Sequence, residues 1–314
     1  MNKKAAIIAG VAIVGLIGAF ALSGKNKSQE TEVKGTELVT VQDENGTIEV
    51  AKNPERVVTF DYGVLDILDN MGVEVVGLPQ KSVPEYLSKY KADTYANVGS
   101  LKEPDFEAVN ELNPDLIIIS GRQADMYDKF AQIATTVYLS VDGSDYLNDF
   151  SRNLDVLGKI FDKEDFVKEN LDNLTKQMEE VKAIAQEKNV NALTTMVSEG
   201  DLSVFSDKSR FGLIYNQLGV TNKDANIEES NHGQQVTFEY IAEQNPEYIF
   251  VVDKGSATGG EGTAKALFDN DLIKSTDAYK NDKIVYLDSA AWYVVAGGLD
   301  STQTMINNIK DAIK

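Results

Sequence analysis

Hydrophobic and polar positions alternate along most of the chain in the order strand, helix, strand. The apolar runs at 56–60 and 115–120 have the length and continuity of strands buried on both faces. Between them, residues 63–71 have helical spacing and end at Gly72, a typical helix C-cap. Short connections of this kind predict parallel sheets covered by helices. The alternation resumes after residue 189, so we expect two Rossmann-like α/β lobes.

A different pattern separates the two alternating regions. Between residues 144 and 163 the apolar positions recur at spacings of three and four, which predicts one amphipathic helix. At 1.5 Å per residue it would be roughly 27 Å long, enough to join two lobes. A second, charged helix is predicted through 163–188. We therefore expect lobes at 46–143 and 164–314, one long rigid linking helix, and a ligand cleft between the lobes.

Both alternating regions contain the motif F-E-x-[VI]-x-E-x-N-P-[DE]. It begins at Phe106 and again at Phe238, 132 residues later, and six of 14 aligned positions are identical. That distance is far longer than a solenoid period and indicates a duplicated domain. Gly72 and Gly219 form a weaker echo at matching places. The alternative is chance recurrence of a common helix–turn–strand pattern.

The N-terminus has the pattern of an export signal. Lys3 and Lys4 precede an uncharged apolar run at 5–22, with small residues suitable for cleavage at 19–21. Residues 1–24 are therefore predicted as a signal peptide or, uncleaved, a membrane anchor, with the protein in a periplasm or on the outer face of the cytoplasmic membrane. Residues 25–45 are mostly polar and predict a flexible tether, whose end enters a β-hairpin turn at Asp43-Glu44-Asn45-Gly46.

Composition excludes several classes of function. The net charge of −20 repels nucleic acid and anionic membrane surfaces. The chain has no cysteine and one histidine, which excludes disulfides, thiolate sites and multi-histidine metal clusters. No G-x-S-x-G elbow, H-E-x-x-H helix or phosphate-binding loop is present. We therefore expect a binding protein without an intrinsic cofactor, and not an enzyme.

Three basic residues are candidates for binding an anion. Arg122 and Lys254 each follow a predicted strand, and Arg210 precedes a predicted helix. Residues at the carboxyl ends of strands line the clefts of α/β proteins. Two guanidinium forks and an ammonium would suit an anionic ligand. The alternative is three independent surface charges.

His232 and Tyr293 are candidates for metal ligation. Each lies in a predicted loop, where a lone histidine is more often packed or solvated and a tyrosine more often packs. Together, however, an imidazole nitrogen and a phenolate oxygen could ligate Fe(III), a hard ion that favours anionic oxygen.

With these residues in place, the chain resembles the siderophore-binding proteins of iron ABC transporters, the class III periplasmic binding proteins of the ferric enterobactin and catecholate type. The likeness covers essentially the whole mature chain, and its more specific segments are Gly121-Arg122-Gln123 and Ser209-Arg210-Phe211-Gly212. It implies that Arg122, Arg210 and, by position, Lys254 hold the anionic chelate. Lys254 replaces an arginine of the relatives and lacks its planar fork.

The resemblance also implies the remaining roles. His232 and Tyr293 would complete the iron sphere of a linear, tetradentate chelator. Glu107 and Glu239, from the duplicated motif, would dock a monomeric protein onto the permease subunits of the importer. They could instead be ordinary solvated residues that favour the helix dipole. A departure concerns anchoring: Leu22-Ser23-Gly24 is followed by Lys25, so thioether lipidation is impossible.

Other functions stay open at this point. In the same class, the ligand could be haem, cobalamin or a hydroxamate siderophore. In another class, an exported siderophore esterase would use His232 as a base, although the sequence has no nucleophile motif for it. A surface adhesin that retains only the fold of a binding protein would bind no small anion.

Overall fold

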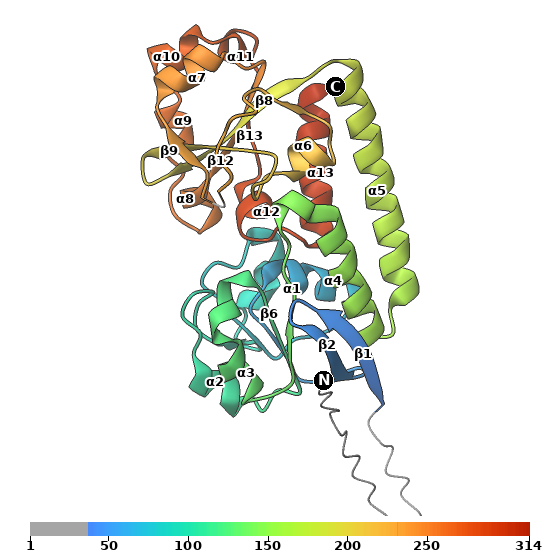
Figure 1. Ribbon diagram of the computed structural model, residues 1–314. Coiled ribbons are helices and arrows are strands. Elements are labelled where there is room, and N and C mark those ends of the chain that lie inside the picture. Colours follow the sequence, from blue (N-terminus) through green and yellow to red (C-terminus); the bar gives the residue numbers. More distant parts are fainter. Residues whose placement is uncertain (1–36, 231) are drawn as a thin grey trace, which may run out of the picture. The chain divides into compact units, whose positions relative to one another are not determined.

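The computed structural model describes residues 37–230 and 232–314. The predicted signal peptide at 1–24 and the larger part of the predicted tether lie outside the described residues. Thr36–Lys314 forms one compact unit. Within it the chain folds into two α/β lobes, as the alternating pattern predicted (Figure 1).

An antiparallel hairpin opens the described chain. It consists of β1 (Leu38–Asp43) and β2 (Gly46–Ala51), paired along their full length as the turn pattern predicted. The Asp43 carboxylate accepts hydrogen bonds from the backbone N–H of Asn45 at 2.8 Å and of Tyr138 at 2.9 Å, which ties the hairpin to the N-terminal lobe. The end of the segment assigned to the tether, 25–45, is therefore strand β1 and its turn.

The N-terminal lobe contains a five-stranded sheet in the order β5-β4-β3-β6-β7, in which every pair is parallel. All four residues of β6 are buried, as expected for a strand covered on both faces. The strands are β3 (Val57–Thr59), β4 (Gly77–Leu78), β5 (Ala96–Asn97), β6 (Leu116–Ile119) and β7 (Thr136–Tyr138). The helices are α1 (Tyr62–Met71), η1 (Glu85–Lys91), α2 (Phe106–Glu111), η2 (Gly121–Met126), α3 (Tyr127–Ala131) and η3 (Gly143–Asp145).

The C-terminal lobe has a mixed sheet. Its strands follow the path β11-β9-β8-β12-β13, with β10 also paired to β8. β10, β8, β12 and β13 are parallel, whereas β9 and β11 are antiparallel to their partners. The strands are β8 (Asn191–Ser198), β9 (Asp201–Phe205), β10 (Thr221–Asn222), β11 (Gln234–Val236), β12 (Tyr248–Asp253) and β13 (Ile284–Tyr286).

The β8–β9 hairpin was not predicted. Its two turn residues, Glu199 and Gly200, have φ values of 55° and 93°, which is the left-handed pair of a tight hairpin turn. Glutamate is unusual at such a φ, so the local sequence carries a weak turn signal. The helices of this lobe are α6 (Leu213–Asn216), α7 (Phe238–Gln244), α8 (Lys254–Ala257), α9 (Ala264–Leu267), α10 (Asp271–Ser275), α11 (Asp277–Lys280), α12 (Ser289–Tyr293) and α13 (Leu299–Ile313).

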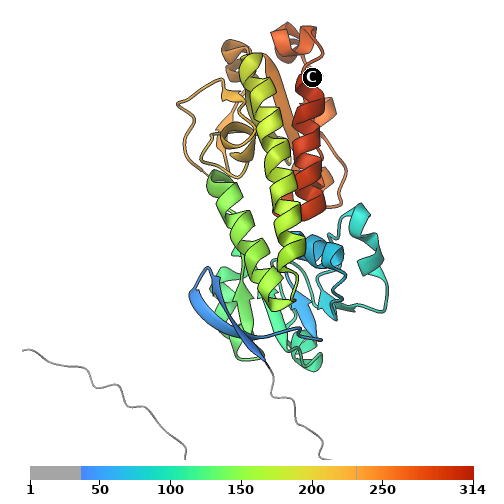
Figure 2. The same cartoon turned by 90° about the vertical axis from the view of Figure 1, so that its right-hand side faces the viewer.

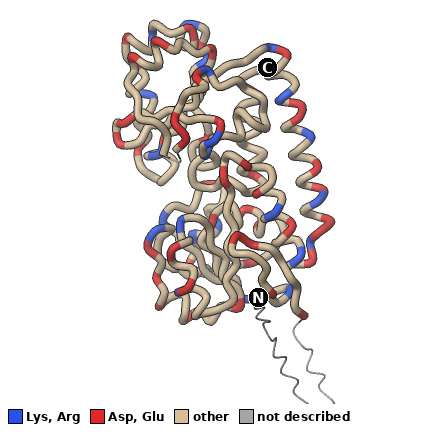
Figure 3. The backbone as a smooth tube through the Cα atoms, in the orientation of Figure 1, with Lys and Arg blue, Asp and Glu red and all other residues tan. Residues whose placement is uncertain are grey.

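A long helix connects the lobes, as predicted, but it follows the segment to which the sequence assigned it. α4 (Tyr146–Ile160) occupies the predicted linking segment and packs against β1. The chain then turns back into α5 (Glu164–Glu187), whose 24 residues measure roughly 36 Å and lead to the C-terminal sheet. Figures 1 and 2 show α5 running beside both α4 and α13. Acidic and basic residues follow one another along α5, as expected for its solvated face (Figure 3).

The duplicated motif has the same local structure in both lobes. α2 and α7 are its helices, and each leads through a left-handed asparagine into a buried strand, β6 or β12. Asn113 and Asn245 both have a φ of 43°. The earlier echo matches as well: Gly72 has a φ of 72° and Gly219 of 71°. The two copies of the motif therefore share one local structure, and domain duplication stays a prediction, because a common helix–turn–strand pattern would give the same structure.

A buried junction joins the lobes at α13. Asp66 of α1 is fully buried and accepts hydrogen bonds from the backbone N–H of Asp300 at 3.0 Å and of Ser301 at 2.9 Å. The Tyr86 hydroxyl donates a third, at 2.7 Å. A Cβ at Gly298 would lie only 2.3 Å from Asp66 Oδ2, so glycine is required for this approach. α13, assigned by sequence to the C-terminal lobe, thus also packs on the N-terminal lobe.

A candidate ligand-binding cleft

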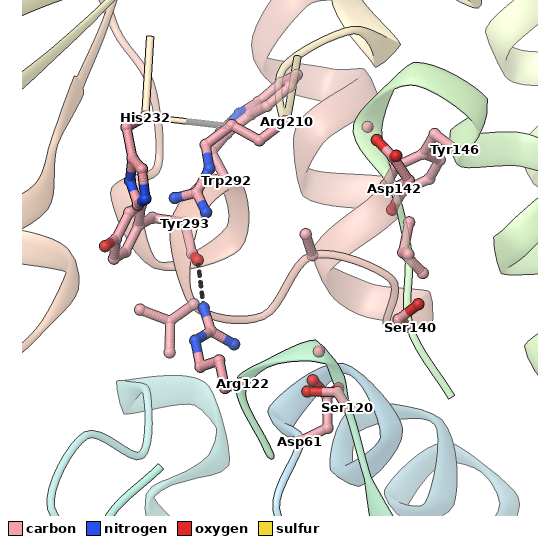
Figure 4. A pocket seen from close by; sticks show the side chains of 15 residues that line it. Asp61, Ser120, Arg122, Ser140, Asp142, Tyr146, Arg210, His232, Trp292 and Tyr293 are labelled. Atoms are coloured by element: carbon pink, nitrogen blue, oxygen red, sulfur yellow. Dashed lines mark hydrogen bonds between the residues drawn. The ribbon is translucent and has the colours of Figure 1, made fainter. Parts of the chain in front are cut away.

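The cleft predicted between the lobes is present. It has a volume of about 440 Å³, within the usual size range of small-molecule sites. Both lobes contribute side chains, which come from the loops that follow β3, β6 and β7 and from the region around α12 (Figure 4). The lining residues are Asp61, Ser120, Gly121, Arg122, Ser140, Val141, Asp142, Gly143, Tyr146, Arg210, His232, Trp292, Tyr293, Val294 and Ala296.

Arg122 enters the cleft from the N-terminal lobe. It is the second residue of η2, which begins directly after the buried strand β6. The backbone N–H of Ser120 donates to Gln123 Oε1 at 3.1 Å and fixes the start of this turn. From there the Arg122 guanidinium reaches across and donates to the backbone carbonyl of Tyr293 at 3.0 Å. Arg122 therefore contacts both walls of the cleft.

Arg210 enters from the C-terminal lobe, and its backbone packs closely against that of Gly143. A Cβ at Gly143 would lie 2.4 Å from the Arg210 carbonyl, so glycine there allows the two loops to pack. The Arg210 guanidinium lies over the Tyr293 ring, 4.7 Å from its centroid. Burial lowers the pKa of Arg210, and nearby Arg122 lowers it further. Arg210 Nε is buried without a hydrogen-bond partner among the described residues. An anionic ligand would supply the missing acceptor.

Lys254 is not brought into the cleft. It is the first residue of α8, and its ammonium donates to Ser198 Oγ at 3.0 Å. Lys254 is not among the residues that line the cavity. The structure thus brings two of the three predicted basic residues together, and a ligand contact by Lys254 stays a prediction.

His232 and Tyr293 both line the cavity, at the end where the two arginines lie (Figure 4). Tyr293 is the last residue of α12, a short helix where the sequence suggested a loop. His232 is solvent-exposed, and its loop is held by Gly233, whose φ is 76° and whose Cβ would lie 2.7 Å from the Phe205 ring. The pair can offer one nitrogen and one oxygen to a metal ion that brings its other ligands with it.

The cleft also contains acidic residues that the sequence reasoning missed. Asp61 lies in the loop between β3 and α1 and is the N-cap of α1, and Asp142 lies between β7 and α4. The signal was present for Asp61, since the first strand–helix turn of an α/β sheet is a common ligand position. Asp142 has a similar place in the loop after β7, but no strand was predicted there from the sequence, so this position gave no signal.

Glu107 and Glu239 lie elsewhere. Each is the exposed second residue of its motif helix, α2 in one lobe and α7 in the other, and neither lines the cleft. A hydrogen bond from the Thr237 side chain holds the pKa of Glu239 below its usual value. The two glutamates are therefore accessible on separate lobes, as a docking role requires.

Two further observations concern metal and membrane. Residues 37–230 and 232–314 contain no cluster of three or more acidic or histidine side chains able to hold a metal ion. In the same part of the chain, no helix is both long and apolar enough to cross a bilayer.

Residues 57–291 match the sequence profile of the periplasmic binding protein family. The chain is 46% identical to the petrobactin-binding protein YclQ of Bacillus subtilis, over 99% of each sequence. The ferric-anguibactin-binding protein FatB of Vibrio anguillarum is 28% identical, over 86% of each sequence.

Solved structures agree with these sequence matches. The crystal structure of YclQ superposes with a TM-score of 0.86 at 48% identity and covers 88% of this chain and 99% of its own. The periplasmic catecholate-siderophore binding protein VctP of Vibrio cholerae gives a TM-score of 0.84 at 36% identity, covering 88% of this chain and 100% of its own.

Proposed function

The chain belongs to the periplasmic binding protein family, and we propose that it is an extracytoplasmic solute-binding protein that captures Fe(III)-catecholate siderophores for an ABC importer. The observation that carries the proposal is the arrangement around Tyr293. Arg122 binds its backbone carbonyl, Arg210 lies over its ring, and both line one cavity with His232. Two cations beside an oxygen and a nitrogen ligand suit an anionic ferric chelate.

The charge of the two cleft arginines also supports this ligand class. Within the described residues neither cleft arginine forms an ion pair, and Arg210 Nε has no acceptor. A neutral hydroxamate chelate would leave both guanidinium charges uncompensated, whereas haem and cobalamin are tested with the ligand panel below. The name of VctP agrees with a catecholate ligand, and the proposal is for this class rather than for one siderophore.

An enzymatic role has less support. His232 is the one histidine of the chain, and no cysteine is available as a nucleophile. Ser120 and Ser140 line the cleft, but Ser140 Oγ donates to Glu44 Oε1 at 2.6 Å rather than to His232. An esterase would need a nucleophile within hydrogen-bond reach of its base. We therefore propose binding and delivery without turnover.

Delivery would use the two exposed glutamates. We infer that Glu107 and Glu239 pair with basic residues on the two permease subunits, one for each lobe, and that the protein acts as a monomer. Export by the N-terminal segment would place it outside the cytoplasmic membrane. Exposed rim charges of this kind steer association and fix orientation more than they add affinity.

Fluorescence titration tests the ligand assignment. Trp292, the single tryptophan, lines the cleft, so a bound ferric catecholate should quench its emission. The mature protein is titrated with linear and cyclic ferric catecholates, with a ferric hydroxamate, haem and cobalamin as a panel. A rise in melting temperature provides an independent readout, since a ligand that binds only the folded state stabilises it. Absence of quenching and of stabilisation with every catecholate would refute the proposal.

A further inference from the structure

A short segment, residues 294–298, connects the cleft to the buried junction between the lobes. It follows Tyr293, the last residue of α12, and ends at the N-cap of α13, and two of its residues line the cleft. Figure 1 shows α12 and the start of α13 where the two lobes meet. Within the segment, the backbone N–H of Val295 donates to the Ala290 carbonyl of α12 at 3.1 Å, so the segment and Tyr293 move together.

Asp66 of α1 holds this segment through Ser301 of α13. The Asp66 carboxylate accepts a hydrogen bond from the Ser301 backbone N–H at 2.9 Å. The Ser301 hydroxyl in turn donates to the Val295 carbonyl at 2.8 Å and accepts from the Gly298 N–H at 3.0 Å. Both Asp66 and Ser301 are buried, and a fully bonded buried network is rigid. A continuous path of hydrogen bonds therefore runs from the N-terminal lobe to the residues that follow Tyr293.

Close packing also confines this segment. A Cβ at Gly63 of α1 would lie 2.8 Å from the Ala296 carbonyl. A Cβ at Gly297, whose φ is 95°, would lie 2.7 Å from Val141 in the loop after β7. The Gly297 N–H also donates to the Tyr146 hydroxyl of α4 at 3.1 Å. The segment therefore has little room to shift while α1 and α13 stay joined.

The contact between Arg122 and Tyr293 depends on this arrangement. Arg122 belongs to the N-terminal lobe, and its guanidinium donates to the Tyr293 carbonyl at 3.0 Å. An arginine side chain has several rotatable bonds, so it can follow the carbonyl but cannot fix where the carbonyl lies. The buried Asp66 carboxylate, which accepts from the start of α13 and from Tyr86, fixes the spacing of the lobes instead.

Resting on the proposed function, we propose that Asp66 is a positioning residue for the ferric catecholate, because it holds Tyr293 at the place where Arg122 and the ligand meet it. Asp66 does not line the cleft and does not touch the ligand. Its effect passes through Ser301 and the 294–298 segment. Binding sites need such supporting contacts because their ligand-binding groups must be held to within about 0.5 Å. The affinity for the ligand therefore depends on a hydrogen bond outside the cleft.

Two variants break the path at different points. Ser301→Ala removes the hydroxyl but keeps the N–H that donates to Asp66, and Asp66→Asn keeps only one of the two accepting oxygens. Each should weaken ferric catecholate binding by about tenfold, within the range of coupling between residues of one hydrogen-bond network. Calorimetric titration well below the melting temperature of each variant measures the loss. The matched control is Gly72→Ala at the other end of α1. It strains the fold but has nothing within 4 Å of its new Cβ, so it should change affinity less than about threefold.

A double-mutant cycle with Arg122→Gln distinguishes positioning from a general loss of structure. Because Ser301→Ala acts on the contact between Tyr293 and Arg122, its effect should shrink to about threefold or less when Arg122 is already replaced. Equal losses in both backgrounds, or wild-type affinity in Ser301→Ala, would overturn this inference and leave the proposed function standing. If the wild-type protein binds no ferric catecholate, both fail. Ser301→Ala decides the matter if Asp66→Asn folds poorly, since it leaves Asp66 and its hydrogen bonds in place.

Discussion

The Arg122 guanidinium donates a hydrogen bond to the backbone carbonyl of Tyr293, with 3.0 Å between Nη2 and the oxygen, and so connects the two lobes across the cleft. The Arg210 guanidinium lies over the ring of the same tyrosine. Tyr293 therefore lies between the two cations, and any ligand atom that reaches its side chain also enters the field of both.

Arg210→Gln should weaken ferric catecholate binding by about 10- to 100-fold, because a hydrogen bond to a charged group contributes roughly 1.5–3 kcal/mol. Arg122→Gln should cause a similar loss and also remove the contact between the lobes. Titration of each variant with one ferric catecholate measures the effect. Lys254→Gln is the matched control. Since Lys254 does not line the cleft, its substitution should change affinity less than about threefold. A loss equal to that of Arg210→Gln would show that Lys254 contacts the ligand, as the sequence predicted.

His232→Ala should weaken binding selectively. A tetradentate chelator leaves two iron positions for His232 and Tyr293, whereas a hexadentate chelator leaves none. The variant should therefore lose much more affinity for a linear tetradentate ferric chelate than for a hexadentate one, and Tyr293→Phe should show the same selectivity. The measurement is the ratio of the two dissociation constants for each protein. An equal loss for both chelators would exclude direct coordination.

Much of this architecture was predictable because the signals are local. Asn113 and Asn245 stop their helices through a left-handed φ of 43°, and Pro114 and Pro246 prevent continuation, so the duplicated motif specifies helix, turn and strand without help from tertiary contacts. Arg122 and Arg210 were found for a related reason: they are rare residues next to the ends of regular elements.

The parts that could not be predicted depend on packing between distant segments. The linking segment 144–163 has the right amphipathic spacing, but spacing does not reveal that α4 folds against β1 while α5 spans the lobes. Asp142 lies in the cleft because it follows β7, a strand that the sequence pattern did not reveal. Lys254 follows β12 as expected, yet its ammonium donates to Ser198 instead of lining the cavity. Ser198 is the last residue of the neighbouring strand β8, and the pairing of β8 with β12 could not be read from the sequence near Lys254.

The buried junction at Asp66 predicts a pH dependence of stability. Burial raises the pKa of Asp66 to about 6, against the hydrogen bonds from Asp300, Tyr86 and Ser301, which lower it, while the charge of Asp300 raises it. The folded state therefore binds this proton more tightly than the unfolded chain, whose Asp pKa is near 3.9. The stabilising contribution is complete below about pH 3.9 and is lost as pH rises through about 6.

Asp66→Asn cannot titrate and isolates this effect. The free energy of unfolding of wild type minus that of the variant should fall as pH rises from 4.5 to 7.5, by about 1.4 kcal/mol for each pKa unit of difference between the two states. Urea denaturation of both proteins at several pH values measures it. A difference that stays constant or grows with pH would contradict the assignment.

Gly298→Ala should destabilise the same junction. The added Cβ would lie 2.3 Å from Asp66 Oδ2, so α1 or the start of α13 must move, at a cost of about 2 kcal/mol or more. Gly72→Ala separates strain from collision: its φ is 72°, but nothing lies within 4 Å of the new Cβ, so we expect only about 1 kcal/mol. Thermal unfolding compares the two. Equal destabilisation by the two substitutions would contradict the predicted collision, because α1 and α13 would then accommodate the new Cβ at no added cost.

Substitution of the two motif glutamates should reduce iron uptake through the importer without changing the affinity for the ligand. Glu107→Ala and Glu239→Ala lie outside the cleft, so each variant and the double variant should bind the ferric ligand with wild-type affinity. If each glutamate pairs with one permease subunit, iron uptake by cells or importer-containing vesicles should fall in each single variant and further in the double variant. The matched control is Glu111→Ala together with Glu243→Ala, the other glutamate pair of the same motif, which should leave uptake unchanged. Normal uptake by the Glu107, Glu239 double variant would exclude docking through these residues, whereas weakened ligand binding would show that they act on the cleft.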